Sequence, residues 1–264
     1  MTWANTSLGV RLGIVFGGIT ILLSVISSEI AGSFARQKIQ EDLGRDLSQL
    51  AYQMSSELDH NMFERYREIQ IIAGLQPFSD PEATDSEKRS LLDTLQSTYP
   101  SYSWIGFADQ DGTVQASTQG LLQGKNVAER DWFVAAQDKP HVGDVHEAML
   151  LAKLLSNPSG SILRFVDVAA PVYDDQGNFQ GVLGAHLSWK WAEEVRSGLL
   201  DTPSAANKEI LIVDQGGTVL LSSPTWQGRE LNLESLQLAR SQQLGSVIEE
   251  WPDGQTYLVG YIAS

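Results

Sequence analysis

The sequence predicts an α+β protein in which an apolar N-terminal helix and a long amphipathic helix precede two small antiparallel-sheet modules. Three observations support this prediction. An uncharged run lies near the N-terminus, apolar residues recur at helical spacing in the segment that follows, and a short motif occurs twice in the remainder. The chain has 264 residues, which is enough for one large or two small domains.

Residues 1–34 are predicted to form a transmembrane anchor. Arg11 and Glu29 bracket a run without charged residues, and the flanking apolar residues extend it to roughly the 20 residues that span a bilayer. A cleaved leader is the alternative, because Ser33-Phe34-Ala35 resembles a small-x-small cleavage site. The anchor is favoured, since cleavage would leave the following helix unattached.

Residues 35–75 are predicted to form one long stalk helix. A helix that continues from a membrane segment is suited to passing on a signal and to forming a homodimer; alternatively, it only packs on the domain that follows. The prediction rests on apolar residues spaced by three and four, which mark one face of an amphipathic helix: Ile39, Leu43, Leu47, Leu50, Met54, Leu58, Met62, Ile69 and Ile72.

The motif Asp-Gln-x-Gly-Thr-Val-x-x-Ser occurs twice, beginning at Asp109 and at Asp214. Each copy follows a β-prone run, and its glycine can take the positive φ of a tight hairpin turn. The repeat predicts one module at 76–190 and a second at 191–264. Two coincidental hairpins are the alternative.

Further strands and one helix are expected in these modules. Turn-forming residues at 174–178 and at Pro252-Asp253-Gly254 each separate two β-prone runs. The expected strands are 103–107, 161–173, 179–188, 209–213, 245–250 and 256–262, with a helix at 189–200 and a polar linker at 201–207.

Composition excludes several functions. The formal net charge is −15, which repels nucleic acid, so no nucleic-acid partner is expected. The absence of cysteine excludes disulfides, Cys-ligated zinc and thiol nucleophiles. No nucleophile elbow, phosphate-binding glycine loop or His-Glu-x-x-His motif occurs, and the chain is not expected to be an enzyme or to need a cofactor.

The chain resembles the double Cache family, the paired PAS-like sensor domains that lie outside the membrane in bacterial receptors. The residues that carry the resemblance are Tyr99 to Asp109, Gly124, Arg130-Asp131-Trp132-Phe133, Ala170 to Gly177 and Gly181 to Leu187. A weaker likeness at Ala185 to Trp189 is to receptors whose output is a diguanylate cyclase.

The resemblance implies the sensor region of a receptor in the inner (cytoplasmic) membrane, with its modules facing the periplasm or the cell exterior. Its expected partners are a small-molecule ligand, the membrane through the N-terminal helix, and a second copy through the stalk. A cytoplasmic output, such as a diguanylate cyclase or a histidine kinase, is expected beyond Ser264. The alternative is a periplasmic or secreted binding protein with a cleaved leader.

The resemblance also implies that the module at 76–190 is membrane-distal and holds the ligand. An arginine offers donors for a carboxylate, and aromatic rings offer apolar walls. The alternatives are a structural salt bridge for Arg130 and a plain core position for Trp132. The candidate ligand-binding residues are Trp104, Lys125, Arg130, Trp132, Phe133, Asp144, His146, Asp167 and His186.

The amino-acid-binding branch of this family has a tyrosine five residues before the arginine and an aspartate on the later strand. Lys125 and His186 stand at those places here. The amine of an amino acid would lose its acceptor, and the site would be more cationic. We therefore expect a ligand with an anionic group.

Residues 141–147 read as a strand, which would place Asp144 and His146 on one face. They would then contact the ligand, or be exposed residues at a strand end. A metal site is the third alternative, but the spacing matches no known zinc signature, so no metal is expected.

Overall fold

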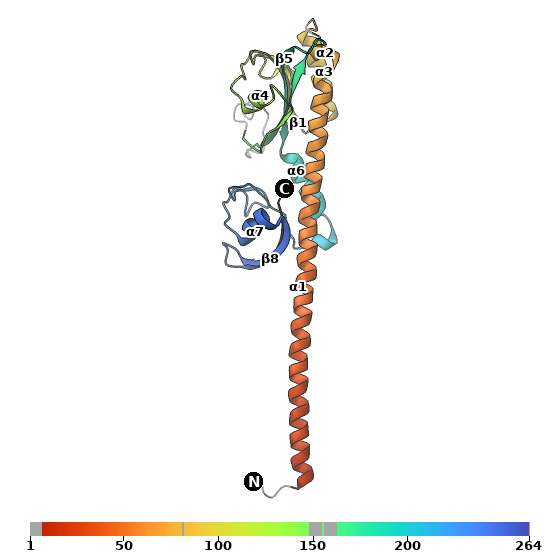
Figure 1. Cartoon of the computed structure of the whole chain (residues 1–264), viewed down its shortest axis with the longest axis vertical. Coiled ribbons are helices and arrows are strands. Elements are labelled where there is room, and N and C mark those ends of the chain that lie inside the picture. The colour runs from red at the N-terminus through yellow and green to blue at the C-terminus, as the bar shows by residue number, and fades with distance from the viewer. Residues whose placement is uncertain (1–6, 81, 148–154, 156–162, 264) are drawn as a thin grey trace. The chain divides into compact units, whose positions relative to one another are not determined.

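The structure, a computed structural model, describes residues 7–80, 82–147, 155 and 163–263 (Figure 1). The chain forms two compact units. The larger unit comprises Met54–Asp214 and Val219–Gly228. The smaller unit comprises Met1–Gln53, Gln215–Thr218 and Arg229–Ser264.

A single helix, α1 (Leu8–Ala73), contains both the apolar and the amphipathic segment (Figure 1). Its N-terminal part is long and apolar enough to cross a membrane, a criterion that a leader peptide also meets, and its side chains there are exposed. The expected apolar stripe is buried only in part. Ile69 is fully buried, whereas Ile39 and Leu43 are 57% and 46% exposed. The spacing was thus a correct guide to the helix but not to burial along its whole length.

The larger unit is built on one antiparallel sheet with strand order β2-β1-β5-β4-β3. The expected strands at 103–107 and 179–188 are present. The strand expected at 161–173 begins at Phe165, and residues 161 and 162 lie outside the described residues. The strands are β1 (Tyr102–Asp109), β2 (Val114–Ser117), β3 (His141–Val142), β4 (Phe165–Tyr173) and β5 (Phe179–Ser188).

One face of this sheet packs against helices. The end of α1 lies along it (Figure 1), with α2 (Gln76–Ser79) and α3 (Asp85–Thr98). Thr84 begins α3 with a capping box, in which Thr84 and Glu87 each satisfy the other's backbone N–H. The core on this face comprises Ile69, Ile72, Ala73, Phe78, Leu92, Tyr102, Ile105, Phe107, Val168, Ala170, Val172, Leu183, Ala185 and Leu187.

The opposite face carries a second core beneath the short helix α4 (Asp131–Ala135). Successive side chains of a strand point to opposite faces, so Ile105 lies in the first core and the preceding residue, Trp104, lies in the second core. The 3-10 turn η2 (Thr118–Gly120) connects β2 to the loop that leads to α4. The core comprises Trp104, Ala108, Val114, Val127, Trp132, Phe133, Ala136, Phe165, Ala169 and Val182.

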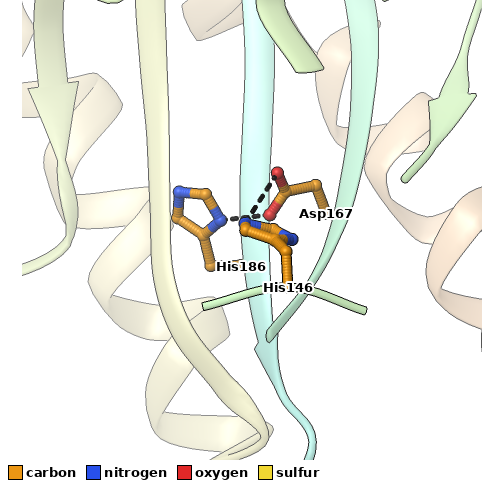
Figure 2. A group of neighbouring side chains, drawn as sticks. All are labelled: His146, Asp167 and His186. Carbon is orange, nitrogen blue, oxygen red and sulfur yellow. Dashed lines mark hydrogen bonds and ion pairs between the residues drawn. The ribbon is translucent and has the colours of Figure 1, made fainter. Parts of the chain in front are cut away.

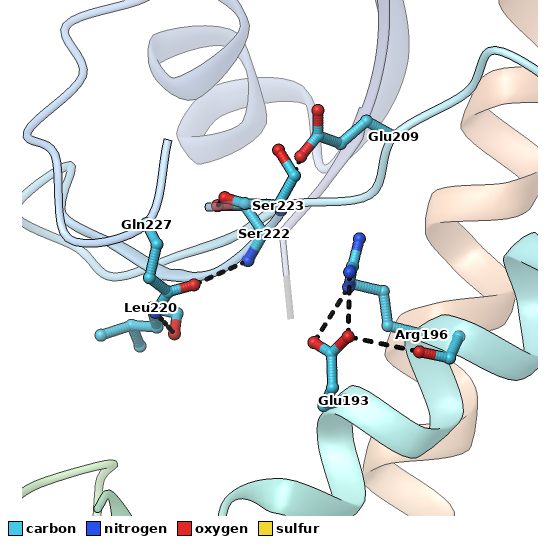
Figure 3. A network of polar contacts seen from close by, with 8 residues as sticks. Glu193, Arg196, Glu209, Leu220, Ser222, Ser223 and Gln227 are labelled. Carbon is cyan, nitrogen blue, oxygen red and sulfur yellow. Dashed lines mark hydrogen bonds and ion pairs between the residues drawn. The ribbon is translucent and has the colours of Figure 1, made fainter. Parts of the chain in front are cut away.

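The remaining part of the larger unit consists of a helix, a 3-10 turn and a short strand pair. Helix α6 (Lys190–Leu200) forms where the sequence predicts it, and Arg196 makes a two-pronged contact with Glu193 (Figure 3). In the same view, the side chain of Gln227 accepts from the N–H of Ser222 and donates to the carbonyl of Leu220. The other elements are η3 (Pro203–Ala205), within the expected linker, and the paired strands β6 (Ile212–Val213) and β7 (Val219–Leu221).

The smaller unit pairs β8 (Leu244–Glu250) with β9 (Thr256–Ile262), close to the expected bounds, and adds α7 (Glu234–Gln242). The hairpin lies directly against α1. Ser48 donates to the carbonyl of Gly245, and a Cβ at Gly260 would collide with the backbone of α1. Only a glycine permits this approach.

The repeated motif has the same local geometry in both copies. The carbonyl of Gly112 accepts from Val127, and that of Gly217 accepts from Leu231. Both glycines have positive φ, 79° and 96°, as the turn requires. These matched bonds support a local structural duplication rather than two unrelated hairpins.

We expect Gly181→Ala to destabilise the larger unit by at least about 2 kcal/mol. Gly181 has φ of +146°, and an added Cβ would collide with the carbonyl oxygen of Ala108 on β1. Urea unfolding followed by tryptophan fluorescence measures the change. Gly198→Ala in α6, where an added Cβ meets nothing within 4 Å, is the control and should be neutral or stabilising. Equal midpoints for the two variants would contradict this account.

Candidate functional site

Three polar or aromatic side chains form a row across adjacent strands of the larger sheet. Trp104 on β1 pairs with His186 on β5, and His186 pairs with Asp167 on β4. Residues directly opposite in an antiparallel pair lie on the same face with close Cβ atoms. The sheet therefore brings these three side chains together.

The register of the β4–β5 hairpin is set by an irregularity near its turn. Tyr173 pairs with Phe179, but Val172 pairs with Gly181, so β5 contains one extra residue at this point. Beyond the bulge, every residue of β5 is shifted by one relative to β4. His186 rather than Ala185 consequently faces Asp167.

His146 joins this row from the segment after β3. It forms an isolated bridge with Phe165, the first residue of β4. Figure 2 shows the three side chains converging. Nδ1 of His186 is hydrogen-bonded to Oδ1 of Asp167, and Nε2 of His146 lies 3.4 Å from Oδ2. On its other side, Nδ1 of His146 lies 3.1 Å from the carbonyl oxygen of Asp144.

Aromatic rings surround His186. The ring centroids of Trp104, Trp132 and Phe165 lie 5.2, 6.2 and 6.1 Å from that of His186. The indole N–H of Trp104 donates to the carbonyl of Leu121, which fixes the ring. The polar groups thus lie against an apolar wall, which is the usual composition of a small-molecule site.

The site opens to solvent at one side chain. The side chains of Asp167 and His186 are each 9% exposed, whereas that of His146 is 39% exposed. A carboxylate with two imidazoles can bind a charged or polar group, or a metal ion.

The structure brings together six of the nine candidate residues. Phe133 is buried beside Trp132, with ring centroids 5.9 Å apart. The other five contribute directly to the site: Trp104, Trp132, His146, Asp167 and His186.

The other three candidates, Lys125, Arg130 and Asp144, have exposed side chains. Arg130 is the residue preceding α4, and within the described part of the chain it makes no ion pair. This disfavours the structural salt bridge as the role of Arg130.

The expected strand at 141–147 is wrong beyond Val142. The ladder ends there, and the carboxylate of Asp144 accepts from the N–H of Val145. Asp144 and His146 therefore do not share a strand face. Asp167, on the neighbouring strand β4, lies beside His146 instead.

Sequence reasoning missed Phe165 and gave no reason for placing Asp167 opposite His186. Counting outward from the turn at 174–178 finds the right pair of strands. It gives the wrong facing residue, Ala185, unless the extra residue before Gly181 is recognised.

The family model described as Cache domain matches residues 33–263. No curated protein sequence matches the chain significantly. Solved structures with similar folds include an extracellular ligand-binding receptor from Desulfohalobium retbaense DSM5692, at 15% identity and a TM-score of 0.58. That match covers 83% of this chain but only 38% of the receptor chain.

Two other similar structures are sensor or ligand-binding domains. One is the sensor domain of the histidine kinase DctB of V. cholerae, at 14% identity and a TM-score of 0.53, with 89% of this chain and 99% of that chain covered. The other is the ligand-binding domain of the amino-acid chemoreceptor PctC of Pseudomonas aeruginosa PAO1 in complex with GABA. Its identity is 14% and its TM-score 0.59, with 82% and 90% of the two chains covered.

We expect Asp167→Ala to lower the free energy of unfolding by about 1–3 kcal/mol, because it leaves the buried ring of His186 without its partner. Thermal or urea unfolding measures the loss. Asp144→Ala, at an exposed carboxylate close by in the chain, is the control and should change stability by less than about 0.5 kcal/mol. Equal losses would show that the contact with His186 contributes nothing.

Proposed function

Because the chain belongs to the Cache domain family, we propose that it is the extracytoplasmic sensor region of a membrane-bound signalling receptor and binds a small molecule in its larger unit. The family's domains are ligand-binding modules rather than enzymes. We propose that the whole receptor carries a cytoplasmic output, such as a histidine kinase or a diguanylate cyclase. The similarity to the sensor domain of a histidine kinase is in keeping with the first of these.

The observation that carries the proposal is the convergence of His146, Asp167 and His186 beside Trp104 and Trp132. Buried polar groups cost free energy unless they are paired, and a cluster of titratable side chains against an apolar wall is a typical ligand site. The cluster lies on the sheet face that α1 does not cover.

We propose that the ligand has an anionic group. Oδ1 of Asp167 is taken by the hydrogen bond with His186 and Oδ2 faces the ring of His146, so neither oxygen is presented freely to an ammonium group. Arg130, two residues before the buried Trp132 and three before the buried Phe133, has an exposed guanidinium without an ion pair among the described residues. A guanidinium of this kind suits a carboxylate or a phosphate.

The sheet offers a route from this site to α1. Val168 and Ala185 are neighbours of Asp167 and His186 in the chain, but they point to the opposite face and pack in the core with Ile69 of α1. A ligand that displaces the site strands would move this core as well, because packed interiors do not absorb displacement locally. Helix α1 continues without interruption into its apolar segment, which supports an anchor that is retained.

We also propose that two copies associate through α1. The side chains of Ile39 and Leu43 are exposed and lie one helical turn apart on the same side. A second α1 would remove this apolar surface from water.

The ligand proposal predicts that organic anions, and not neutral amines, raise the melting temperature of the chain. A thermal-shift screen of dicarboxylates, phosphates, amino acids and amines tests it. The screen is run once in EDTA and once with added Zn²⁺, because the cluster could also bind a metal ion. Arg130→Gln should weaken the apparent affinity for the anion, derived from the concentration dependence of the shift, by at least about 10-fold, because a charge-assisted pair is lost. Lys139→Gln, which also removes an exposed cation, is the control. Stabilisation by amines or amino acids alone would refute the anionic ligand.

The dimer proposal can be tested with single cysteines because the chain has none of its own. Ile39→Cys and Leu43→Cys should each give a disulfide-linked dimer in detergent micelles under a mild oxidant. Glu41→Cys, on another side of α1, is the control. Cross-linking at all three positions would indicate random collision, and cross-linking at none would argue against this interface.

A further inference from the structure

In the cluster of His146, Asp167 and His186, the contact between Nε2 of His146 and Oδ2 of Asp167 is not a hydrogen bond if His146 is a neutral imidazole. The carbonyl oxygen of Asp144 can only accept a hydrogen bond, so Nδ1 of His146, 3.1 Å away, is the protonated nitrogen. In neutral imidazole Nε2 then carries a lone pair. That lone pair faces Oδ2 of Asp167, another acceptor, at 3.4 Å. Two acceptors facing one another need a proton or a cation between them.

A proton on His146 or on Asp167 would satisfy the contact, and so would a metal ion. We propose that His146, Asp167 and His186 form a binding site for a divalent transition metal of the Zn²⁺ class. This inference concerns the site proposed above for the ligand and rests on that assignment of the site. It adds a component that neither the sequence motifs nor the family match assigns.

The distances fit such an ion. The three candidate ligand atoms, one from each side chain, all lie within 4.8 Å of one another. Tetrahedral zinc with bonds of about 2.0–2.1 Å places its ligand atoms about 3.3 Å apart, close to the 3.4 Å between His146 and Asp167. The hydrogen bond between His186 and Asp167 would open, and the proton on Nδ1 of His186 would pass through solvent to Nε2, which frees the Nδ1 lone pair for the metal.

The surroundings fit as well. Metal-ligating histidines usually donate their other ring N–H to a carbonyl or carboxylate, as His146 does to Asp144. The rings of Trp104, Trp132 and Phe165 give the site a dry apolar wall, which strengthens the attraction between Asp167 and a cation. The partly exposed His146 provides the path of entry.

The donor set selects the kind of metal. Two imidazoles and one carboxylate suit Zn²⁺ and its neighbours, whereas Mg²⁺ and Ca²⁺ prefer all-oxygen sites. Three protein ligands leave a fourth position open. Because one carboxylate offsets only one of the two positive charges, that position favours an anionic ligand, in agreement with the proposed ligand class.

Zinc binding to the full chain in detergent micelles tests the site by competition with a chromogenic chelator. We expect one tight Zn²⁺ per chain, and at least about 10-fold weaker binding for His146→Gln and for Asp167→Asn. His60→Gln and His141→Gln change the two histidines outside the cluster and are the matched controls. Co²⁺ in place of zinc should give the visible absorption of a four-coordinate site, which His146→Gln abolishes.

Each outcome decides the question. No stoichiometric Zn²⁺, or equal weakening in a control and in His146→Gln, overturns the site and indicates adventitious binding to an acidic surface or a protonated His146. Should Asp167→Asn fail to fold, the more exposed His146→Gln still decides. Stabilisation by an organic anion in EDTA without zinc binding overturns the metal site alone. Zinc binding without any anion response overturns the proposed anionic ligand alone.

Discussion

The pairing of β4 with β5 is the constraint on which the rest of the larger unit depends. β5 is the central strand, hydrogen-bonded to β1 on one side and β4 on the other, and residues Gly181 to Leu187 are buried. The bulge beside Gly181 sets which of its residues face which side of the sheet. A slip of one residue would turn His186 toward the helical core and Ala185 toward Asp167. Both the core and the candidate site would then be lost together.

The same strands carry the candidate site on one face of the sheet and the helical core on the other. Val168 and Ala185 are fully buried next to α1 and α3, one residue away from the side chains of the site. No loop or flexible linker intervenes between the two faces. Tyr102 illustrates the tightness of this contact: its hydroxyl donates to Glu68 of α1, and burial together with that bond raises the pKa of Tyr102 well above its usual value.

The long helix α1, the helix α6 and the longer strands could be predicted because they depend on local patterns, whereas the helices α3, α4 and α7 were not predicted. Alternating apolar residues, turn glycines and the repeated Asp-Gln-x-Gly-Thr-Val motif gave the strands within a few residues. The site was less predictable because it depends on register. His146 was expected beside Asp144, two residues away, but the strand ends at Val142 and His146 meets Asp167 instead. Gly181 inside a strand-like run is a local hint of a bulge, but it does not by itself fix the register. No local pattern shows which stretch of an amphipathic helix remains exposed.

The arrangement of Asp167 between two histidines also determines how its negative charge is compensated. A carboxylate as buried as that of Asp167 is costly unless positive charge or donors surround it. His186 supplies one donor, and the carbonyl of Asp144 turns the other imidazole so that its second nitrogen faces the remaining oxygen. A lysine or arginine here would settle the charge permanently. Two imidazoles instead do not fix the charge of the cluster by residue type alone, because an imidazole can be neutral, protonated or a metal ligand.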